Sequence, residues 1–506
     1  MTLPTGDQSS SIQDQPEHLG VRPLRRGAAL DQLGFFLWSR RWFIVALAVG
    51  GIMLSLPTPD GLTREGLIVL TMSLVAVILF ITEPVPLPTV ALMIIVGQVV
   101  LLGIDSEIVA RSIMSDSVLF IMGSLMLAVG IVKQKLDKRI AYMIVRFTGT
   151  KTANICVGIS FVSGMMASVI GEHTVAAMML PVAVTLITLT SDDPKEVRKL
   201  AALLLFSIAY GCAIAAIGTP SGGARNAIMI GFWKEFFYDP LDPETYKYLI
   251  DYVTWMAYCF PIFLLQLPFV SLILLTTFKP EQTHITRAVV KLRAQLEAQG
   301  SMRSNDWGAI LIFTATLIGW IMFSDTLGLG TVAIFGAIAF LVFGLVRWED
   351  INSNVNWGVV LLYGAAISLG VQMKDSGAAM WLADNFLEVL APMGADSGVS
   401  LWLGVSALTT LVTNTMSNGA AVAVLGPITL NLATSAGESP LLMGYITAIS
   451  SAFAYLTVIG TPACTIVYAS GYLKPSDFLK VGWRMVIMST VILMFSAYFY
   501  WPLLGL

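Results

Sequence analysis

Charged residues are scarce in this sequence. Only 12% of its 506 residues are Asp, Glu, Lys or Arg, whereas 56% are hydrophobic and the mean hydropathy is +0.79. Soluble domains average about 25% charged residues, so the composition excludes an ordinary soluble protein and predicts an integral membrane protein. The formal net charge is only −3, which gives no reason to expect a nucleic-acid partner.

Cysteine and histidine are also rare. The four cysteines lie far apart in apolar segments and form no CxxC pair, so we interpret them as small buried hydrophobic residues: Cys156, Cys212, Cys259 and Cys464. Of the three histidines, His18 lies in a polar tail and His284 in a hydrophilic loop. His173 is therefore the only histidine expected at membrane depth, and the absence of HExxH-type spacing argues against a membrane metalloenzyme.

The hydrophobic runs divide the chain into two halves. Residues 1–38 are expected to form a disordered tail, 39–278 a first repeat, 279–307 a hydrophilic linker and 308–506 a second repeat. We expect about 11 transmembrane helices in an all-α fold. Arginines before the first span and the positive balance of the linker place the N-terminus and the linker on the cytoplasmic side.

A carboxylate and an imidazole stand side by side in one apolar run. Glu172 and His173 interrupt residues 152–189, and each arm is about 18 residues long, near the lower limit for a membrane crossing. That length fits two helices as well as a re-entrant hairpin, and we expect a hairpin with a polar tip. Burying either group in hydrocarbon without a partner is costly, so the pair predicts a functional site.

The second half contains a related stretch. A hairpin expected over 399–435 carries its polar tip at Thr413 to Gly419. In both halves the tip is followed by small and apolar residues and then by a proline, Pro181 or Pro427.

Two further spans are interrupted by glycine and proline. The run 200–233 is broken between Gly218 and Asn226, and the run 440–470 is broken around Gly460 to Cys464. Such a pattern predicts a discontinuous helix. Unwound backbone is tolerated in a bilayer only where it lines a cavity or is buried in protein.

Landmarks recur between the halves at a nearly constant offset. Gly123 corresponds to Gly364, Glu172 to Ser417, and Thr219-Pro220 to Thr461-Pro462, at offsets of 241, 245 and 242 residues. Interrupted helices at corresponding positions of an internal repeat point to a secondary transporter and to its binding site. The elements of each half are compatible with inverted topology.

These motifs resemble the divalent anion/sodium symporter family, the carriers of dicarboxylates, citrate and sulfate. The resemblance covers about residues 40–505. It rests on Thr82-Glu83-Pro84-Val85-Pro86, on the first tip followed by Ala176 to Pro181, on Gly218-Thr219-Pro220-x-Gly222-x-x-x-Asn226, on Trp357-Gly358 with Gly364, on Ser417-Asn418, and on Val467 to Lys474.

The resemblance implies two inverted repeats, a homodimer in the bacterial inner membrane, and elevator-like movement of a transport domain against a scaffold. It also implies an anion bound between the two tips and sodium held near each tip. The resemblance and the chemistry of the side chains together predict these anion-binding residues: Glu172, His173, Thr174, Arg225, Ser417, Asn418, Gly419, Thr461 and Pro462. The implied sodium-binding residues are Ser168, Glu172, Gly218, Thr413, Met416, Asn418 and Gly460.

The sequence departs from the family pattern at these same places. The family has Ser-Asn-Thr at each tip, whereas the first tip here reads Glu172-His173-Thr174 and the second has Gly419 in place of the threonine. Arg225 stands in the first helix break, and Cys464 stands where the family usually has an asparagine in the second.

Glu172 admits three interpretations. It could bind sodium more strongly than a serine would. It could carry a proton, because burial disfavours the charged form of a carboxyl group. It could instead be a permanent counter-ion for His173 or Arg225 and so replace the sodium charge.

The other side chains of the two tips and breaks suit an anion. His173 can donate a hydrogen bond, and Arg225 offers a planar fork for a carboxylate, sulfate or sulfonate, although it could also pair with Glu172 or reach the surface. Thr174, Ser417 and Asn418 add neutral donors, and backbone N–H groups at the half-helix starts add positive dipole ends.

The sequence therefore predicts a secondary active transporter of small anions, of the di- or tricarboxylate or sulfate type, coupled to sodium. The alternative is a sodium-independent exchanger or a proton-coupled carrier, with sulfonates among its substrates. A membrane enzyme and a channel fit less well, because no catalytic cluster is evident and the paired tips favour alternating access.

Overall fold

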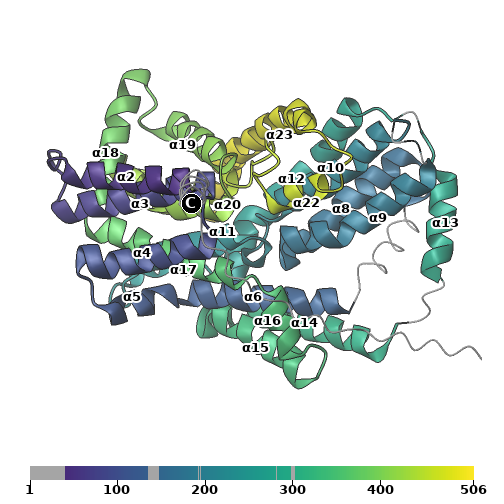
Figure 1. Cartoon of the computed structure of the whole chain (residues 1–506), viewed down its shortest axis with the longest axis horizontal. Coiled ribbons are helices and arrows are strands. Elements are labelled where there is room, and N and C mark those ends of the chain that lie inside the picture. Colours follow the sequence, from purple (N-terminus) through teal and green to yellow (C-terminus); the bar gives the residue numbers. More distant parts are fainter. Residues whose placement is uncertain (1–39, 135–147, 192, 194, 281, 298–301) are drawn as a thin grey trace, which may run out of the picture.

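The computed structural model describes residues 40–506 except 135–147, 192, 194, 281 and 298–301 (Figure 1). Within these residues every regular element is helical, apart from one isolated bridge between Lys151 and His284. Nine helices of the described ranges are long and apolar enough to cross a membrane, and five shorter apolar helices accompany them. The predicted all-α membrane fold is confirmed; the tail expected over 1–38 lies outside the described residues.

The first half begins with α2 and ends with α12. Its elements are α2 (Arg41–Ser55), α3 (Arg64–Thr82), α4 (Leu87–Leu102), α5 (Ser106–Ile113), α6 (Asp116–Lys133), α8 (Thr152–Ile170), α9 (Glu172–Thr190), α10 (Arg198–Ala215), the short 3-10 helix η1 (Pro220–Gly222), α11 (Ala224–Phe237), η2 (Pro243–Tyr248) and α12 (Tyr252–Thr277).

The second half follows α13 (Thr286–Glu297), which lies within the segment expected to be a linker. Its elements are α14 (Ser304–Leu327), α15 (Leu329–Val342), α16 (Trp348–Asn354), α17 (Trp357–Asp375), α18 (Ala378–Leu390), η3 (Ala391–Met393), α19 (Gly398–Thr413), α20 (Asn418–Ser435), α21 (Pro440–Ser450), α22 (Pro462–Tyr468), α23 (Pro475–Phe495), η4 (Ser496–Tyr500) and η5 (Trp501–Leu504).

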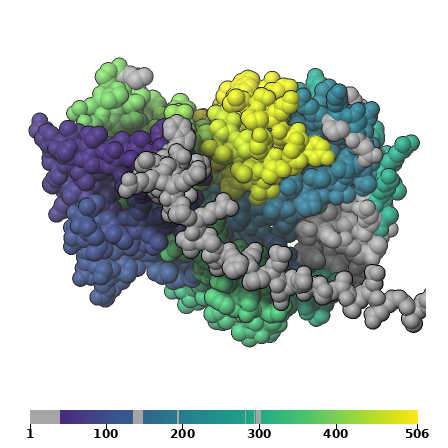
Figure 2. Space-filling model, in the orientation of Figure 1, coloured from purple at the N-terminus to yellow at the C-terminus, as the bar shows by residue number. Residues whose placement is uncertain are grey.

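The two halves interlock rather than stand side by side. Helix α6 packs on α15, while its counterpart α17 packs on α4; likewise α10 contacts α22, and α11 contacts α21. In Figure 1, α8, α9, α10 and α12 gather at one end and α2 to α5 with α18 at the other, with α22 and α23 between them. Figure 2 shows the C-terminal segment on this face, flanked by N-terminal helices and by the α8–α9 region.

Two glycines of the repeat lie at close helix contacts between the halves. A Cβ on Gly123 of α6 would lie 2.6 Å from Ala333 Cβ of α15, and one on Gly364 of α17 would run into the carbonyl of Ile113. Small residues allow membrane helices to approach at backbone distance. The glycine landmarks of the repeat therefore mark the places where one half is pressed against the other.

The structure changes the register in which the two tips correspond. Helix α9 begins at Glu172 and α20 at Asn418, and their interior prolines are Pro181 and Pro427. Both pairs are 246 residues apart, so Glu172 corresponds to Asn418 and not, as the sequence suggested, to Ser417. The reason is the turn: Gly171 alone joins α8 to α9, whereas residues 414–417 join α19 to α20.

Gly171 has backbone angles of φ 99° and ψ 140°. This region is essentially closed to residues with a Cβ. Glycine is thus what allows α8 to turn into α9 in a single residue, with Glu172 placed in the first turn of the second arm.

Candidate functional site

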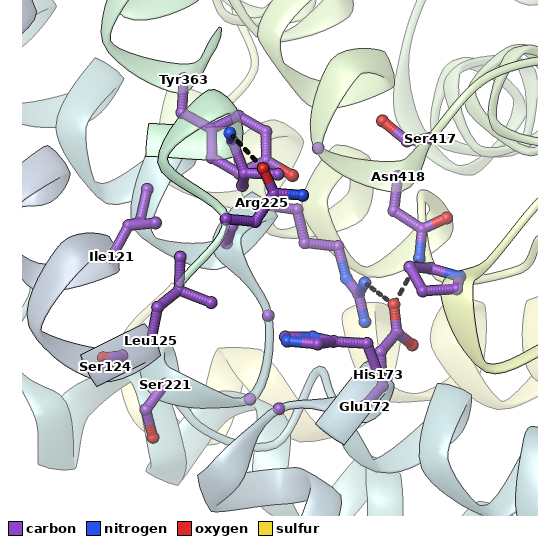
Figure 3. A pocket seen from close by; sticks show the side chains of 18 of the residues that line it. Ile121, Ser124, Leu125, Glu172, His173, Ser221, Arg225, Tyr363, Ser417 and Asn418 are labelled. Atoms are coloured by element: carbon purple, nitrogen blue, oxygen red, sulfur yellow. Dashed lines mark hydrogen bonds and ion pairs between the residues drawn. The ribbon is translucent and has the colours of Figure 1, made fainter. Parts of the chain in front are cut away.

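Four helices begin at the wall of one cavity. The cavity has a volume of ≈ 360 Å³, and its lining includes Glu172, Ala224, Asn418 and Pro462, the first residues of α9, α11, α20 and α22. A helix start carries backbone N–H groups without intrahelical partners and a partial positive charge. The wall is completed by one side of α6 and by the beginning of α17 (Figure 3). The arrangement favours an anion.

Glu172 joins the two tips at this cavity. Its Oε1 atom lies 3.5 Å from Arg225 Nη1 and accepts a hydrogen bond of 3.2 Å from Asn418 Nδ2 (Figure 3). Glu172 and Arg225 are only 6% and 2% exposed. The structure places Glu172 next to Arg225, where the carboxylate and the guanidinium form a buried ion pair. This contact agrees with the interpretation of Glu172 as a counter-ion for Arg225.

This ion pair leaves hydrogen-bonding capacity unused. Glu172 Oε2, Arg225 Nε and Arg225 Nη2 are buried without a hydrogen-bond partner in the described part of the chain. A buried polar group without a partner loses its hydration at a cost of about 1–3 kcal/mol, and more if charged. A ligand that supplies both an acceptor for Arg225 and a donor for Glu172 would recover this cost.

The first helix break places Arg225 by tight backbone packing. Asn226 Nδ2 donates to the carbonyls of Ala216 and Thr219, at 2.8 and 2.7 Å, and so closes the loop that separates α10 from α11. A Cβ on Gly222 would lie 2.7 Å from the Ala216 carbonyl oxygen. Arg225 is the second residue of α11, so the packed loop fixes the position of its Cα and Cβ atoms.

A second, larger cavity adjoins the first. It has a volume of ≈ 690 Å³, and Leu125, His173 and Asn356 line both cavities. His173 is exposed to this space, and Thr174 lines the larger cavity but not the smaller one. The two cavities are therefore neighbours, and His173 lies on the boundary between them.

A charged pair lies on the wall of the larger cavity. Lys133, at the end of α6, donates to Asp350 of α16. This hydrogen bond, together with one from the Arg347 backbone N–H, holds the pKa of Asp350 below its usual range. Asp350 is therefore ionised at neutral pH on the wall of the larger cavity.

Oxygen atoms converge behind the second tip. Thr413 Oγ1 lies 2.7 Å from the Ser451 carbonyl oxygen and 3.0 Å from Asn418 Oδ1, and its single proton can be donated to either oxygen. Asn414 ties the tip to the second helix break by donating to the Phe453 carbonyl and accepting from the Leu456 N–H. Hydroxyl, amide and carbonyl oxygens of this kind are hard ligands suited to an alkali cation.

At the first tip and its helix break, several backbone carbonyls accept side-chain hydrogen bonds, while the amide oxygen of Asn226 has no partner among the described residues. The Ser168 carbonyl accepts from the Thr219 hydroxyl, and the Ser168 hydroxyl donates to the Met165 carbonyl at 2.8 Å. The amide nitrogen of Asn226 donates hydrogen bonds to the carbonyls of Ala216 and Thr219 in the helix break. The two tips therefore differ in charge: the second offers neutral oxygens only, whereas the first carries the carboxylate of Glu172.

The predicted anion-binding residues fall into two groups. Those that line the smaller cavity are Glu172, His173, Arg225, Ser417, Asn418, Gly419 and Pro462. Thr461 does not line it; its hydroxyl accepts from the Cys464 N–H and caps α22.

The predicted sodium-binding residues other than Glu172 and Asn418 lie outside the lining of the smaller cavity: Ser168, Gly218, Thr413, Met416 and Gly460. Gly218 packs towards Phe260 of α12, and Gly460 packs against Ala454. The four cysteines are free and buried, as expected.

Sequence reasoning missed the wall formed by α6 and α17. The missed polar lining residues are Ser124, Ser221, Asn356 and Tyr363. Tyr363 directly precedes Gly364, a landmark of the repeat. Its position beside this landmark was the one sequence signal that could have identified it as a site residue. No motif indicated that α6 and α17 face the two tips.

Tyr363 explains the missing threonine of the second tip. A Cβ on Gly419 would overlap the ring and hydroxyl of Tyr363. The tyrosine thus occupies the space that a threonine side chain would need, and it brings its own hydroxyl to the cavity wall.

Comparison with known proteins identifies the family. The profile described as the sodium:sulfate symporter transmembrane region matches residues 38–506. The chain belongs to this family. The resemblance carried by the motifs is thereby confirmed, and this sodium:sulfate symporter family member is a membrane transporter rather than an enzyme.

Individual relatives agree with this placement. An uncharacterized transporter of Haemophilus influenzae is 27% identical over 79% of this chain and 85% of its own length. The sodium-dependent dicarboxylate transporter SdcS of Staphylococcus saprophyticus is 23% identical over 91% of each chain. SdcS of Staphylococcus aureus is 23% identical over 88% of each.

One solved structure shares the fold of this family member. The YdaH transporter of Alcanivorax borkumensis aligns with a TM-score of 0.52 at 13% identity, covering 78% of this chain and 86% of that one.

We predict that Arg225→Gln destabilises the protein more than the double variant Glu172→Gln/Arg225→Gln. Removing one member of a buried ion pair leaves a buried unpaired charge and costs about 3–5 kcal/mol, whereas removing both costs less. Melting temperatures in detergent measure the difference. The matched control is Arg198→Gln, which breaks a 3.7 Å pair with Asp477 whose arginine is half exposed. If the double variant is as unstable as Arg225→Gln, Glu172 and Arg225 do not form a buried ion pair.

We predict that Gly419→Thr lowers both the melting temperature and the uptake of transported anions. Overpacking a filled site costs about 1–3 kcal/mol, and here the threonine meets the ring of Tyr363. The added change Tyr363→Ala should restore stability to Gly419→Thr. Gly404→Thr is the control in the same hairpin, because a Cβ there meets only Leu390, at 4.0 Å. Equal losses in the two threonine variants would rule out the steric explanation.

Proposed function

We propose that this protein is a secondary active transporter of small anions, which it binds in the cavity between the two hairpin tips. The observation that carries the proposal is the buried guanidinium of Arg225, which lines the cavity and keeps two nitrogens without a hydrogen-bond partner among the described residues. Arginine binds carboxylate, sulfate and sulfonate through such paired N–H groups. The four helix starts add positive potential.

The proposed substrates are small di- or tricarboxylates or sulfate-like anions. A cavity of ≈ 360 Å³ lies at the lower end of the range typical of small-molecule sites. The name of SdcS, a sodium-dependent dicarboxylate transporter, supports the carboxylate class. His173, Ser417, Asn418 and Tyr363 would supply further hydrogen bonds to the bound anion.

We propose that sodium is the coupling ion and that it binds behind the second tip. Thr413 Oγ1 lies 3.0 Å from Asn418 Oδ1 and 2.7 Å from the Ser451 carbonyl oxygen, so three oxygens meet there. Sodium binding would rotate the Thr413 hydroxyl so that its lone pairs, together with the other oxygens, face the cation. Met416 and Gly460 would contribute backbone from the tip and the break.

The alternative is a sodium-independent exchanger or a proton-coupled carrier, with sulfonates among its substrates. It is favoured by the first tip, where the Ser168 carbonyl already has a donor and where Glu172 brings a fixed carboxylate. In that case Glu172 and His173 replace one sodium site.

The proposed movement is elevator-like, within a homodimer in the bacterial inner membrane and with a cytoplasmic N-terminus. Each hairpin is tied to its own helix break, the first through Thr219 and Ser168 and the second through Asn414 and Phe453. A hairpin and its break therefore form one unit that can move together. The dimer and the orientation follow from the family resemblance and from the charge pattern.

We predict that proteoliposomes containing the protein accumulate at least one labelled anion of a panel of succinate, malate, citrate, sulfate and a sulfonate. With sodium coupling, replacing external sodium by choline at fixed pH abolishes the uptake. Uptake that persists in choline and is driven by a pH gradient or by internal anion would instead indicate the proton-coupled carrier or the sodium-independent exchanger. Arg225→Gln should abolish uptake under either coupling, and undiminished uptake by this variant would contradict the proposed site.

A further inference from the structure

We propose that the site selects acids that also carry an ammonium group: the acid binds at Arg225 and the ammonium binds at Glu172. This inference rests on the proposed function and narrows its substrate class. Amino dicarboxylates and amino sulfonates are the chemical types that fit.

The geometry of the ion pair is the first argument. The ion pair joins Glu172 Oε1 and Arg225 Nη1, at 3.5 Å, and it lacks the two parallel hydrogen bonds that an arginine and a carboxylate can form. Glu172 Oε2 and Arg225 Nε and Nη2 remain without partners in the described part of the chain. A buried acceptor and a buried donor pair thus lie side by side, which is the pattern complementary to a dipolar ligand.

Asn418 keeps Glu172 in this arrangement. Its amide nitrogen donates to Oε1, while its amide oxygen accepts from Thr413 behind the tip. Oε1 is therefore shared between Asn418 and Arg225, and Oε2 is the oxygen left for a ligand.

The charge balance is the second argument. Arg225 and Glu172 together contribute no net charge, so a dianion would be balanced only by the partial positive charges of the helix starts and by a sodium ion, if one binds at the second tip. An ammonium group on the substrate reduces its net negative charge by one unit, with or without a bound sodium ion. Uncompensated charge in a buried site is costly, so the ammonium-bearing acid is favoured whichever coupling operates.

Matched pairs of probes test the proposal in proteoliposomes of the full chain. L-aspartate and succinate share a four-carbon dicarboxylate skeleton and differ by the ammonium group; taurine and ethanesulfonate form a second pair. We expect wild-type protein to take up the ammonium member faster in at least one pair. Glu172→Gln should reduce that preference by about tenfold or more, because a hydrogen bond to a charged group contributes about 1.5–3 kcal/mol.

The control is Asp477→Asn. It also removes a carboxylate paired with an arginine, at 3.7 Å, but Asp477 does not line the cavity, so the preference should be unchanged. If Glu172→Gln does not fold, Glu172→Asp keeps the charge on a shorter side chain and should show a reduced preference.

The outcomes are distinguishable. Uptake of the acids with no preference for the ammonium members, or a preference retained in Glu172→Gln, overturns this inference and leaves the anion-transport proposal intact. Absence of uptake of every probe, including the anion panel, overturns the proposed function and this inference with it.

Discussion

The contact among Glu172, Arg225 and Asn418 is the constraint around which this molecule is organised. A carboxylate 6% exposed within an apolar protein is tolerated only with a charged or hydrogen-bonding partner. The partners come from the first helix break and from the opposite half of the chain. Satisfying one side chain therefore requires the first tip, the first break and the second tip to meet, and the cavity is the space that this meeting encloses.

The repeat supplies two similar tips, but the chain uses them differently. In the register set by the helix starts, a carboxylate faces an amide: Glu172 stands where Asn418 stands in the other half and bonds to it directly. The second tip presents neutral oxygens suited to a cation, whereas the first carries the carboxylate of Glu172 beside Arg225. Approximate symmetry therefore builds the cavity, and departures from it decide which charges the cavity contains.

Much of this could be predicted from the sequence because hydrophobic runs, glycine–proline breaks and buried charges are local signals. The polar tips and the candidacy of Glu172, His173 and Arg225 needed no structure. The register of the tips could not be predicted, because the two turns differ in length. The partner of Glu172 remained open among His173, Arg225 and an ion, since only packing decides it. Tyr363 was missed because its role depends on its distance from Gly419 across 56 residues of chain.

The central claim is that the cavity between the tips is the anion site. A cysteine at Ser417, which is half-buried in the cavity wall, tests it most directly in a background where the four buried native cysteines are alanine. We expect a small maleimide to label Ser417→Cys, and a transported anion to slow the labelling in a concentration-dependent manner unless Arg225→Gln is also present. A labelling rate that a saturating transported anion does not change would place the anion site elsewhere.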